Sequence, residues 1–534
     1  MIFKRLTFIS LLLLSSLAGN SQVFEWIRTA PVGYSLNPSY PECPVHFDRV
    51  NQRVVHARID TVTLIYGSYT LGSTFLESRD TAGQVQWQFQ LGNFAIIQRI
   101  VTDQAGNIYV GGLFQQTLSI GSNDSLEFII APFVFQNTFI IKLDIQGNLI
   151  WKRNVTNTWS QYEGIEAMAV DQNGNCWYAM TDFFIAKIVE MDGSGTDQVI
   201  HTIENGKRIG NFSFDPWGGM YVSGAAEHGN FIMDADTFVA ASDYNMFIAR
   251  FDAAGQPGWA YFGHDITFQK PMVIADGFGN AFMAGNRFDT TSFNGVLFTD
   301  PYLSNDFFAF KIDTSGTISW DLQQPPLGIG PFGNFETGSN LVVDADAAGN
   351  FYLGGIQRNT VDWGGNFISS TPNFNDRLIT ITCVNPSGIV QWVKMGGGIY
   401  TNTMHALSVS DAGACYFTGS FRNAAEFDSI IFANSIDYNF VLGKINPAIP
   451  SGIHEYGDEQ LIIYPNPSSV EINLPDEMLN SMLQIFDVAG KLIYQDLKVG
   501  VQKINIREFK QGVYTLVVQN EQSIFHSKFV IKHY

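Results

Sequence analysis

The stretch DQAGNIYVGGLF, Asp103 to Phe114, decides the fold because its pattern returns along most of the chain. It has Asp at the first position, Gly at +3, an aromatic residue at +6 and Gly at +9, and we call this the first frame. Asp starts a turn by accepting hydrogen bonds from the backbone that follows, and Gly takes the positive φ that the turn needs. The alternating apolar residues on either side predict strands. Asp103 and Gly106 therefore mark the turn of a hairpin.

Two frames alternate along the chain and define a repeating unit. First frames begin again at Asp171, Asp215, Asp276, Asp346 and, more weakly, Ser410. A degenerate relative, TLIYGSY, ends at Tyr69. The second frame has Asp or Asn, Gly at +3 and Trp at +7, and it ends at Trp87, Trp151, Trp259, Trp320 and Trp392. The copy from Asp192 has Val199 in place of Trp, and the copy after Ile445 is cut short. One unit is four strands joined by two tight turns and one variable loop.

Four strands per unit and a period of about 45 to 70 residues predict a β-propeller. The frames predict seven blades, although six or eight remain open because two units are degenerate. The last unit supplies three strands, and VFEWIRT near the N-terminus places Trp26 where a fourth-strand Trp belongs. We expect this N-terminal strand to complete the last blade, so that residues 22–450 form a ring without an open edge.

The frames also resemble known repeats. The first frame resembles the SBBP repeats of bacterial propellers and, less closely, NHL repeats. The second frame is similar to the tryptophan motif of quinoprotein propellers, which has one more residue between Asp and Gly. These resemblances imply an architecture and say little about a ligand.

The chain has 534 residues and a formal net charge of −20, which disfavours nucleic acid and anionic lipid as partners. Residues 1–21 contain Lys4 and Arg5 followed by an apolar run, the pattern of a secretory signal peptide. No later stretch is long and apolar enough for a transmembrane segment. We therefore expect a secreted protein, located outside the cell or on the outer-membrane surface.

The last eighty residues have a different pattern. Residues 451–460 are a polar linker, and residues 461–534 contain alternating strands that predict a small β-sandwich. This segment resembles the type A C-terminal sorting domain of the type IX secretion system of Bacteroidetes. The resemblance rests on the following residues: Pro465, Asn466, Pro467, Gly490, Lys491, Gly512 and Tyr514. It implies the type IX secretion machinery as a partner and, in that family, attachment to surface polysaccharide.

Evidence for chemistry is sparse. Cys43, Cys176, Cys383 and Cys415 form no C-x-x-C pair, and buried thiols are favoured over disulfides for three of them. The G-x-G-x-x-G match at Gly328 to Gly333 follows QQPP instead of a strand, so a dinucleotide site is not indicated. We predict no cofactor and no catalytic residue. Calcium remains an open ligand because carboxylates cluster at three places: Asp344 with Asp346, Asp234 with Asp236, and Glu190 with Asp192 and Asp197. None of the clusters has the complete calcium-loop pattern with its closing Glu, so turn capping is the favoured interpretation.

The variable loops leave three functional hypotheses. The longest are residues 115–138, 227–244, 288–305 and 357–375, all between the second and third strands of a unit, so they should emerge on one face. Such a face could bind an extracellular protein or a glycan, or the loops could only cover blade edges. The leading hypothesis is a binding or adhesion module. The alternatives are a propeller enzyme, quinoprotein-like or polysaccharide-active, and a purely structural surface protein.

Overall fold

The computed structural model divides the chain into two compact units, Met1–Ala448 and Ile449–Tyr534, and each is described here by itself. The predicted signal peptide, the linker 451–460, residues 328–332, Gly490 and Lys491 lie outside the described residues. The structure describes residues 22–31, 43–60, 62–65, 68–130, 135–156, 164–182, 185–267, 270–299, 306–324, 333–364, 367–373, 376–398, 402–433, 438–446, 463–474, 482–487, 492–496, 503–519 and 524–532.

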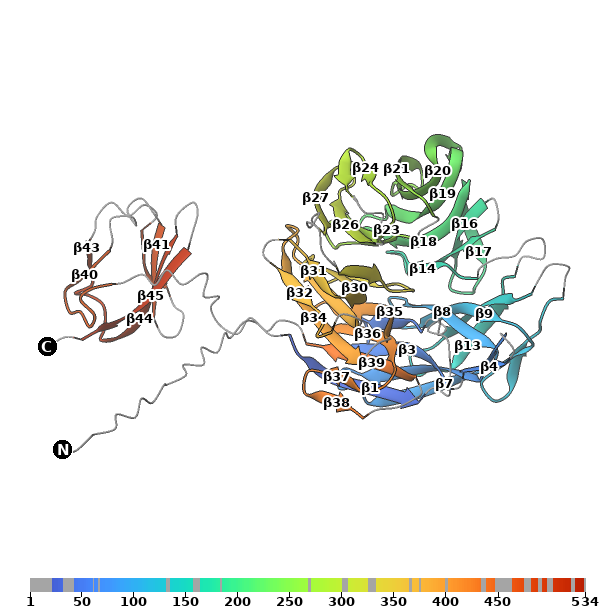
Figure 1. Cartoon of the computed structure of the whole chain (residues 1–534), viewed down its shortest axis with the longest axis horizontal. Helices are drawn as coiled ribbons and strands as arrows, with labels where there is room; N and C mark the ends of the chain where they lie inside the picture. Colours follow the sequence, from blue (N-terminus) through green and yellow to red (C-terminus); the bar gives the residue numbers. More distant parts are fainter. Residues whose placement is uncertain are drawn as a thin grey trace, which may run out of the picture. The chain divides into compact units, whose positions relative to one another are not determined.

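The first unit is a ring of seven blades, and each blade is an antiparallel sheet with four main strands (Figure 1). Blade one consists of β2 (Val45–Asp48), β3 (Arg53–Ile59), β6 (Ser73–Asp80) and β7 (Val85–Asn93). Blade two consists of β8 (Ala95–Thr102), β9 (Ile108–Phe114), β12 (Asn137–Leu143) and β13 (Leu149–Asn154). Blade three consists of β14 (Ala167–Val170), β15 (Cys176–Thr181), β16 (Ile185–Met191) and β17 (Asp197–Glu204). Blade four consists of β18 (Gly206–Phe214), β19 (Met220–Met233), β20 (Asp236–Phe251) and β21 (Pro257–Asp265).

The remaining three blades complete the ring. Blade five consists of β22 (Met272–Ala275), β23 (Ala281–Arg287), β26 (Asp306–Ile312) and β27 (Ile318–Gln323). Blade six has an interrupted first strand, β28 (Asn334–Thr337) and β29 (Val343–Ala345), followed by β30 (Phe351–Arg358), β33 (Arg377–Val384) and β34 (Val390–Gly398). Blade seven consists of β35 (Asn402–Val409), β36 (Cys415–Phe421), β39 (Asn439–Ile445) and β1 (Phe24–Pro31).

The N-terminal strand closes the ring, as the sequence predicts. β1 pairs antiparallel with β39, and Trp26 lies opposite Lys444. Figure 1 shows this pairing as the blue start of the ring beside its orange end. The closure removes the open sheet edge of the three-stranded last unit. The predicted all-β, seven-bladed propeller is therefore confirmed.

The first-frame turn has a well-defined hydrogen-bond pattern. Asp103 Oδ1 accepts from the backbone N–H groups of Ala105 at 3.0 Å and Asn107 at 2.8 Å. Gly106 has φ +80 and donates its N–H to the Asp103 carbonyl at 2.9 Å. The first and second frames join strands one to two and three to four of each antiparallel blade, so both kinds of turn lie on the same side of the ring. We call this side the turn face.

The assignment of TLIYGSY as blade one's first frame is wrong. That segment forms an inserted hairpin of β4 (Val62–Ile65) and β5 (Ser68–Leu71), between the second and third strands. The true first turn begins at Asp48, whose Oδ1 accepts from the N–H groups of Val50 and Asn51. The frame is hidden in the sequence because Asn51 occupies the Gly position and Gln52 adopts the positive φ instead.

The long loops form hairpins that cover neighbouring blades. The hairpin of β10 (Leu118–Ile120) and β11 (Asp124–Leu126) pairs with β7 of blade one through Ile120 opposite Leu91. The hairpin of β37 (Ala425–Phe427) and β38 (Ile430–Phe432) pairs with β34 of blade six. The extended tip of β19 and β20 pairs with β17 of blade three. Each hairpin therefore covers the outer edge of the preceding blade, which is the structural alternative that the sequence left open.

Two further inserted hairpins pack by aromatic side chains. They are β24 (Thr291–Phe293) with β25 (Val296–Phe298), and β31 (Thr360–Asp362) with β32 (Ile368–Ser370). Phe293 and Phe298 of the first hairpin pack on Phe308 of their own blade. Trp363, next to β31, is fully buried against Phe307 and Phe335.

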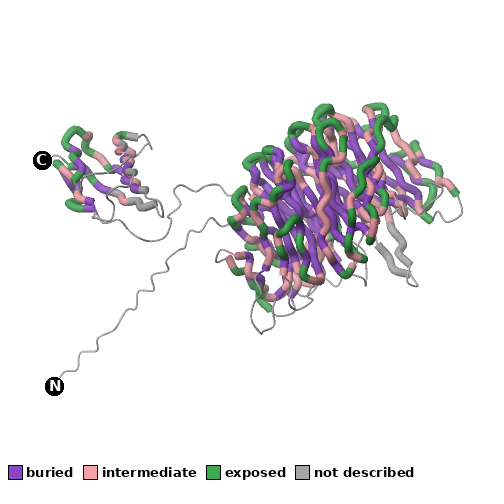
Figure 2. The backbone as a smooth tube through the Cα atoms, turned by 90° about the horizontal axis from the view of Figure 1, so that it is seen from above, coloured by how far each residue is buried: buried purple, intermediate pink, exposed green. Residues whose placement is uncertain are grey.

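In the ring, the strands are mostly buried and the turns between them are mostly exposed. Figure 2 shows buried residues filling the strands and exposed residues at the turns. Cys43, Cys176, Cys383 and Cys415 are all buried and form no disulfide. Burial raises the pKa of Cys383 to about 12, so this thiol is protonated at neutral pH. The cysteines are core residues of the ring.

The second unit is a β-sandwich. One sheet contains β42 (Leu492–Asp496), β41 (Met482–Asp487), β44 (Gly512–Gln519) and β45 (Ile524–Ile531), in that order. Opposite lies a pair formed by β40 (Glu471–Asn473) and β43 (Lys503–Asn505). Ile472 and Ile504 of the pair share one core with Ile485, Leu516 and Phe529 of the sheet. The predicted small β-sandwich is confirmed. The described residues include no helix that could cross a membrane.

Candidate functional site

Most junctions between blades are joined by the second-frame Trp. The indole N–H of this residue donates to the backbone carbonyl just after the second-frame Asp or Asn of the next blade. Five such bonds are described: Trp26 to Thr81 at 3.0 Å, Trp87 to Ile145 at 3.2 Å, Trp151 to Gly193 at 3.0 Å, Trp259 to Thr314 at 3.0 Å and Trp320 to Pro386 at 3.1 Å. We call this contact the Trp clasp.

The clasp also explains a required glycine. Gly147 has φ +85, and a Cβ there would lie 2.7 Å from the Trp87 ring. The same close approach joins Gly83 to Trp26 and Gly388 to Trp320. Trp392 is buried and packs edge-on against Tyr352 at 5.9 Å, and the turn it would reach lies beyond residue 446, outside the described part.

A cation lies opposite the fourth-strand Trp in four blades. In blade two, Lys142 lies opposite Tyr109 on one side and Trp151 on the other. Its Nζ lies 4.6 Å from the Tyr109 ring centre and 3.3 Å from Asp103 Oδ2. The equivalent cations in the other three blades are Arg250, Lys311 and Lys444. An aromatic residue, a cation and a Trp thus form one row across the blade, held by cation–π and ionic contacts.

Blades four and five repeat the ionic contact with the first-frame Asp. Arg250 lies 5.3 Å above the Tyr221 ring and 2.7 Å from Asp215 Oδ2. Lys311 Nζ lies 5.2 Å above the Phe282 ring and 3.2 Å from Asp276 Oδ2. In blade seven, where Ser410 replaces the Asp, Lys444 pairs with Glu25 instead. The space between the first-frame Asp and the aromatic ring is therefore a site for a positive charge.

Blade three departs from this row at two positions. Trp177 is the first-frame aromatic residue, and Glu190 lies opposite it at the position where blades two, four, five and seven have Lys or Arg. Val189 lies opposite Ile200, which places Val199 in the position of the missing Trp. The row of aromatic residue, cation and Trp thus becomes Trp177, Glu190 and Val199. The junction between blades three and four has no Trp clasp.

A pocket of about 240 Å³ opens at this junction, on the turn face. Blade three contributes Asp171, Gln172, Asn173, Trp177, Glu190, Val199 and His201, and blade four contributes Phe214, Gly218, Met220 and the segment Phe251–Gly255. Gln172, Asn173 and residues 252–254 are exposed, whereas Trp177, Met220 and Phe251 are buried. The missing indole and the missing Lys or Arg side chain would otherwise lie at this junction. We call this cavity the junction pocket.

Aromatic rings form one wall of the junction pocket. His201 stacks on Trp177, with ring centres 5.8 Å apart and planes inclined by 8°. His201 also contacts Phe251 at 4.6 Å, and its Nδ1 lies 2.8 Å from Asp234 Oδ2. His201 occupies the position that Arg153 has at the preceding junction. Each of the two side chains lies next to the turn glycine of the following blade, Gly255 for His201 and Gly195 for Arg153. Asp234 therefore fixes the imidazole against Trp177.

Carboxylates form the polar part of the junction pocket. Asp171 Oδ1 accepts from the Asn173 and Asn175 backbone N–H groups, as in the other first-frame turns. Its Oδ2 accepts from Trp177 Nε1 at 3.1 Å. Glu190 Oε1 accepts from Asn175 Nδ2 at 2.7 Å. Asp252 adds a third carboxylate, and no Lys or Arg is among the described lining residues. The pocket combines negative charge with aromatic faces.

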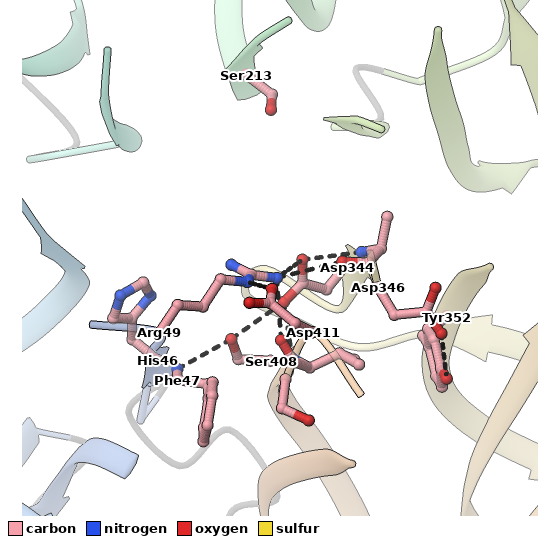
Figure 3. A network of polar contacts seen from close by, with 12 residues as sticks. His46, Phe47, Arg49, Ser213, Asp344, Asp346, Tyr352, Ser408 and Asp411 are labelled. Carbon is pink, nitrogen blue, oxygen red and sulfur yellow. Dashed lines mark hydrogen bonds and ion pairs between the residues drawn. The ribbon is translucent and has the colours of Figure 1, made fainter. Parts of the chain in front are cut away.

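A second polar cluster lies near the centre of the ring and has a structural role. Arg49 Nε donates to Asp411 Oδ1 at 2.9 Å, and Nη2 donates to the Val409 carbonyl at 2.9 Å and to Asp344 Oδ1 at 3.4 Å. Figure 3 shows the guanidinium pointing at these groups and away from Ser213 on the opposite blade. The carboxylate of Asp344, and more weakly that of Asp411, raises the pKa of Arg49 although burial opposes this. Arg49 thus joins blade one to blades six and seven.

The three predicted carboxylate clusters do not form metal centres among the described residues, which contain no group of three or more His, Cys, Asp or Glu placed to hold a metal ion. Asp344 faces Arg49, whereas Asp346 caps its turn and accepts from Tyr352 Oη at 3.0 Å. In the third cluster, Asp192 caps a turn and Asp197 pairs with Arg153, so only Glu190 faces the junction pocket. Asp236 is exposed.

The predicted sorting residues lie on the sandwich. Pro465, Asn466 and Pro467 are exposed, and Asn466 Oδ1 accepts from the Val530 N–H at 2.8 Å. Gly512 begins β44. Tyr514 is buried against Phe529, with ring centres 5.8 Å apart, and its hydroxyl donates to the Lys510 carbonyl. These contacts tie the first motif to the last strand of the unit.

Residues 462–532 match the family model described as the secretion system C-terminal sorting domain. The match lies within the predicted range and confirms the sorting-domain prediction. A tail of this kind implies export to the cell surface or secretion through the type IX machinery. The chain is therefore an exported seven-bladed propeller with a C-terminal sorting domain.

Other comparisons add little about the ring. No curated protein matches the chain. Among solved structures it is similar to a protein from Lactobacillus plantarum, at 11% identity over 85% of this chain and 98% of that chain, with a TM-score of 0.36. A protein of unknown function from Bacteroides caccae is 9% identical over 67% and 94%, with a TM-score of 0.33. A gluconolactonase from Xanthomonas campestris is 9% identical over 78% and 98%, with a TM-score of 0.32. Similarity at this level carries no argument about a ligand.

Sequence reasoning missed the junction pocket. The sequence signal is the loss of Trp at Val199, but it reads as repeat degeneracy until the partner of each Trp is known. That partner lies in the next blade, at a separation of 42 to 66 residues. Glu190 carries a signal too, because it stands where Lys142, Arg250 and Lys311 stand in equivalent strands.

Proposed function

We propose that the exported ring acts as a binding module and that the junction pocket holds its ligand. The observation that supports this most is the coincidence of two changes in one blade. Val199 removes the Trp clasp that is described at five other junctions, Glu190 places a negative charge where four blades have a cation, and a pocket opens at this junction. Both changes remove contacts that stabilise other blades, namely the Trp hydrogen bond and the contacts of the cation. Ligand binding would explain why blade three lacks them.

The loop face is a weaker place for the ligand. Three of its hairpins pair with the outer strands of preceding blades, so part of their hydrogen-bonding capacity is used within the ring. The turn-face pocket has exposed polar residues at its mouth and aromatic rings inside, as small-ligand sites do. The proposal thus favours binding at a blade junction over adhesion through the loops.

The test of this function is ligand screening with a variant whose pocket is filled. Val199→Trp restores the residue found at the equivalent position in other blades. The full chain and this variant would be screened by thermal shift and by ligand-detected NMR against glycans, peptides and small metabolites. We expect at least one ligand class to bind the natural chain and not the variant. Identical binding of every ligand to both proteins would overturn the proposal.

We also propose that the sorting domain determines display on the surface polysaccharide. Deletion of residues 461–534 should leave the ring inside the cell envelope, because the tail is the segment that matches the sorting family. The measurement is immunodetection of the ring in surface and culture fractions, with Lys503→Ala, a substitution of an exposed sandwich residue, as control. Normal surface display of the truncated chain would contradict the role of this tail.

A further inference from the structure

We propose that the junction pocket binds an organic cation, an ammonium or guanidinium group. This inference rests on the proposed binding function and names its ligand class. The ring itself supplies the comparison, because the equivalent space in blades two, four and five is already occupied by such a group. There the cation belongs to the chain: Lys142, Arg250 and Lys311.

The residues that receive the internal cation are retained in blade three. Asp171 and Trp177 correspond to Asp103 and Tyr109, which hold Lys142 Nζ at 3.3 Å from the carboxylate and 4.6 Å from the ring centre. Trp177 offers the strongest cation–π face of the aromatic side chains, but it lacks the hydroxyl that accepts from Lys142 Nζ at 2.7 Å in blade two. Blade three therefore keeps a carboxylate and an aromatic ring at the equivalent positions. Glu190 replaces the Lys or Arg that lies between them in blades two, four and five.

Glu190 then adds attraction for a cation from outside. It converts a position that is positive in blades two, four and five into a negative one, beside Asp171 and near Asp252. In this partly enclosed site the carboxylates are screened less than on an open surface. An anion or a neutral sugar would gain nothing from this charge.

The size of the junction pocket limits the ligand. At about 240 Å³ it is smaller than pockets for drug-sized ligands, which span roughly 300 to 1,000 Å³. It fits a single amine or guanidine side chain, and not several sugar rings. The exposed residues Asn173, Asp252 and Ala254 leave its mouth open on the turn face, so a side chain of another protein or a free amine can enter.

The test uses small probes of matched shape. Agmatine and n-butylamine carry the cation, 1-butanol is a neutral isostere and butyrate is an anion. Titrations of the full chain at about pH 8, where an ordinary His is neutral, should show agmatine binding at least about tenfold tighter than 1-butanol. Added salt should weaken the binding of agmatine and leave the binding of 1-butanol unchanged. Equal binding of cation and isostere would overturn the inference.

Variants of Glu190 test whether the ligand cation binds in the junction pocket. Glu190→Lys supplies the internal cation of the sister blades and should abolish agmatine binding, and Glu190→Gln should weaken it about tenfold. Asp197→Asn is the matched control, because this carboxylate pairs with Arg153 outside the pocket and its loss should change affinity less than about twofold. Undiminished agmatine binding to a folded Glu190→Lys variant would contradict the inference.

Two further outcomes separate this inference from the proposed function. A neutral ligand whose binding is lost in Val199→Trp, with no cation binding, would overturn the ligand class and leave the binding function in place. Absence of any pocket-dependent ligand would overturn both. A peptide that ends in Arg distinguishes the sources: tighter binding than agmatine supports a protein side chain, and weaker binding supports a free amine.

Discussion

The junction between blades two and three and the junction between blades three and four are built on the same frames and end differently. At the first, Trp151 donates to the Gly193 carbonyl and Lys142 fills the space beneath it. At the second, Val199 and Glu190 stand in those positions and a pocket opens. A repeat protein can therefore form a cavity where one residue of the repeat is replaced, because each blade contributes contacts to its neighbour.

The largest effect is expected from breaking the closed junction. Trp151→Ala should lower the free energy of unfolding by about 2 to 3 kcal/mol, since it removes a half-buried indole and its hydrogen bond. Val199→Ala at the open junction should cost less than about 0.5 kcal/mol, because Val199 is 41% exposed. Denaturant unfolding measures both. Equal losses would mean that the two junctions do not differ energetically.

Acid should destabilise the ring through buried histidines near its centre. It should not change the difference in unfolding free energy between the Trp151→Ala and Val199→Ala variants. Burial lowers the pKa of His405 to about 3 and, with the charge of Arg49, that of His46 to about 4. The unfolded chain takes up these protons near pH 6.5, so full stability is present above that pH and is lost as pH falls toward 4. Between about pH 7.5 and 5.5 each His should cost about 1.4 kcal/mol.

His405→Gln should reduce the slope of this acid loss by the contribution of one His. Unfolding free energies at a series of pH values measure the slope, and Val199→Trp serves as control because it should shift the whole curve without changing its slope. A slope unaffected by His405→Gln would show that this imidazole titrates alike in the folded and unfolded chains.

Closing the open junction should stabilise the ring modestly. Val199→Trp should raise the free energy of unfolding by about 1 kcal/mol, because the new indole N–H can donate to the Ala253 carbonyl, the equivalent of Gly193. The new Trp should not displace His201, since Trp151 and Arg153 lie together next to Gly195 at the preceding junction. Thermal unfolding with Val199→Leu as control separates the clasp from simple apolar bulk. Equal gains for Trp and Leu would argue against the clasp.

The smallest effect is expected from restoring the internal cation. Glu190→Lys should add about 0.5 kcal/mol through contacts with Asp171 and Trp177 that resemble those of Lys142. Glu190→Gln removes the charge without supplying a cation and should gain less. A loss of stability in Glu190→Lys would show that blade three does not retain the receptor of blade two.

The frames were enough to predict much of the ring. Asp103 and Gly106 predict a hairpin because turn formation is local, and Trp26 predicts the closure because the strand count leaves one place empty. The turn at Asp48 was not predictable from the frame, since Gln52 provides the positive φ where Gly would have been visible. The frames did not reveal the Arg49 contacts with Asp344 and Asp411, which join residues 295 and 362 positions apart.

The pocket was hidden for the same physical reason. Val199 and residues 252–255 are distant in sequence and meet only because consecutive blades pack side by side. Once the clasp is known in five junctions, a sequence alone can reveal such a site: a missing Trp at +7 together with an acidic residue in the preceding strand.

A crystal structure of the full chain grown with agmatine would show where the cation binds. We expect the guanidinium between the Trp177 ring and the carboxylates of Asp171 and Glu190, in the space that corresponds to that of Lys142 Nζ in blade two. Agmatine bound elsewhere on the ring, with the junction pocket containing only water, would contradict this expectation.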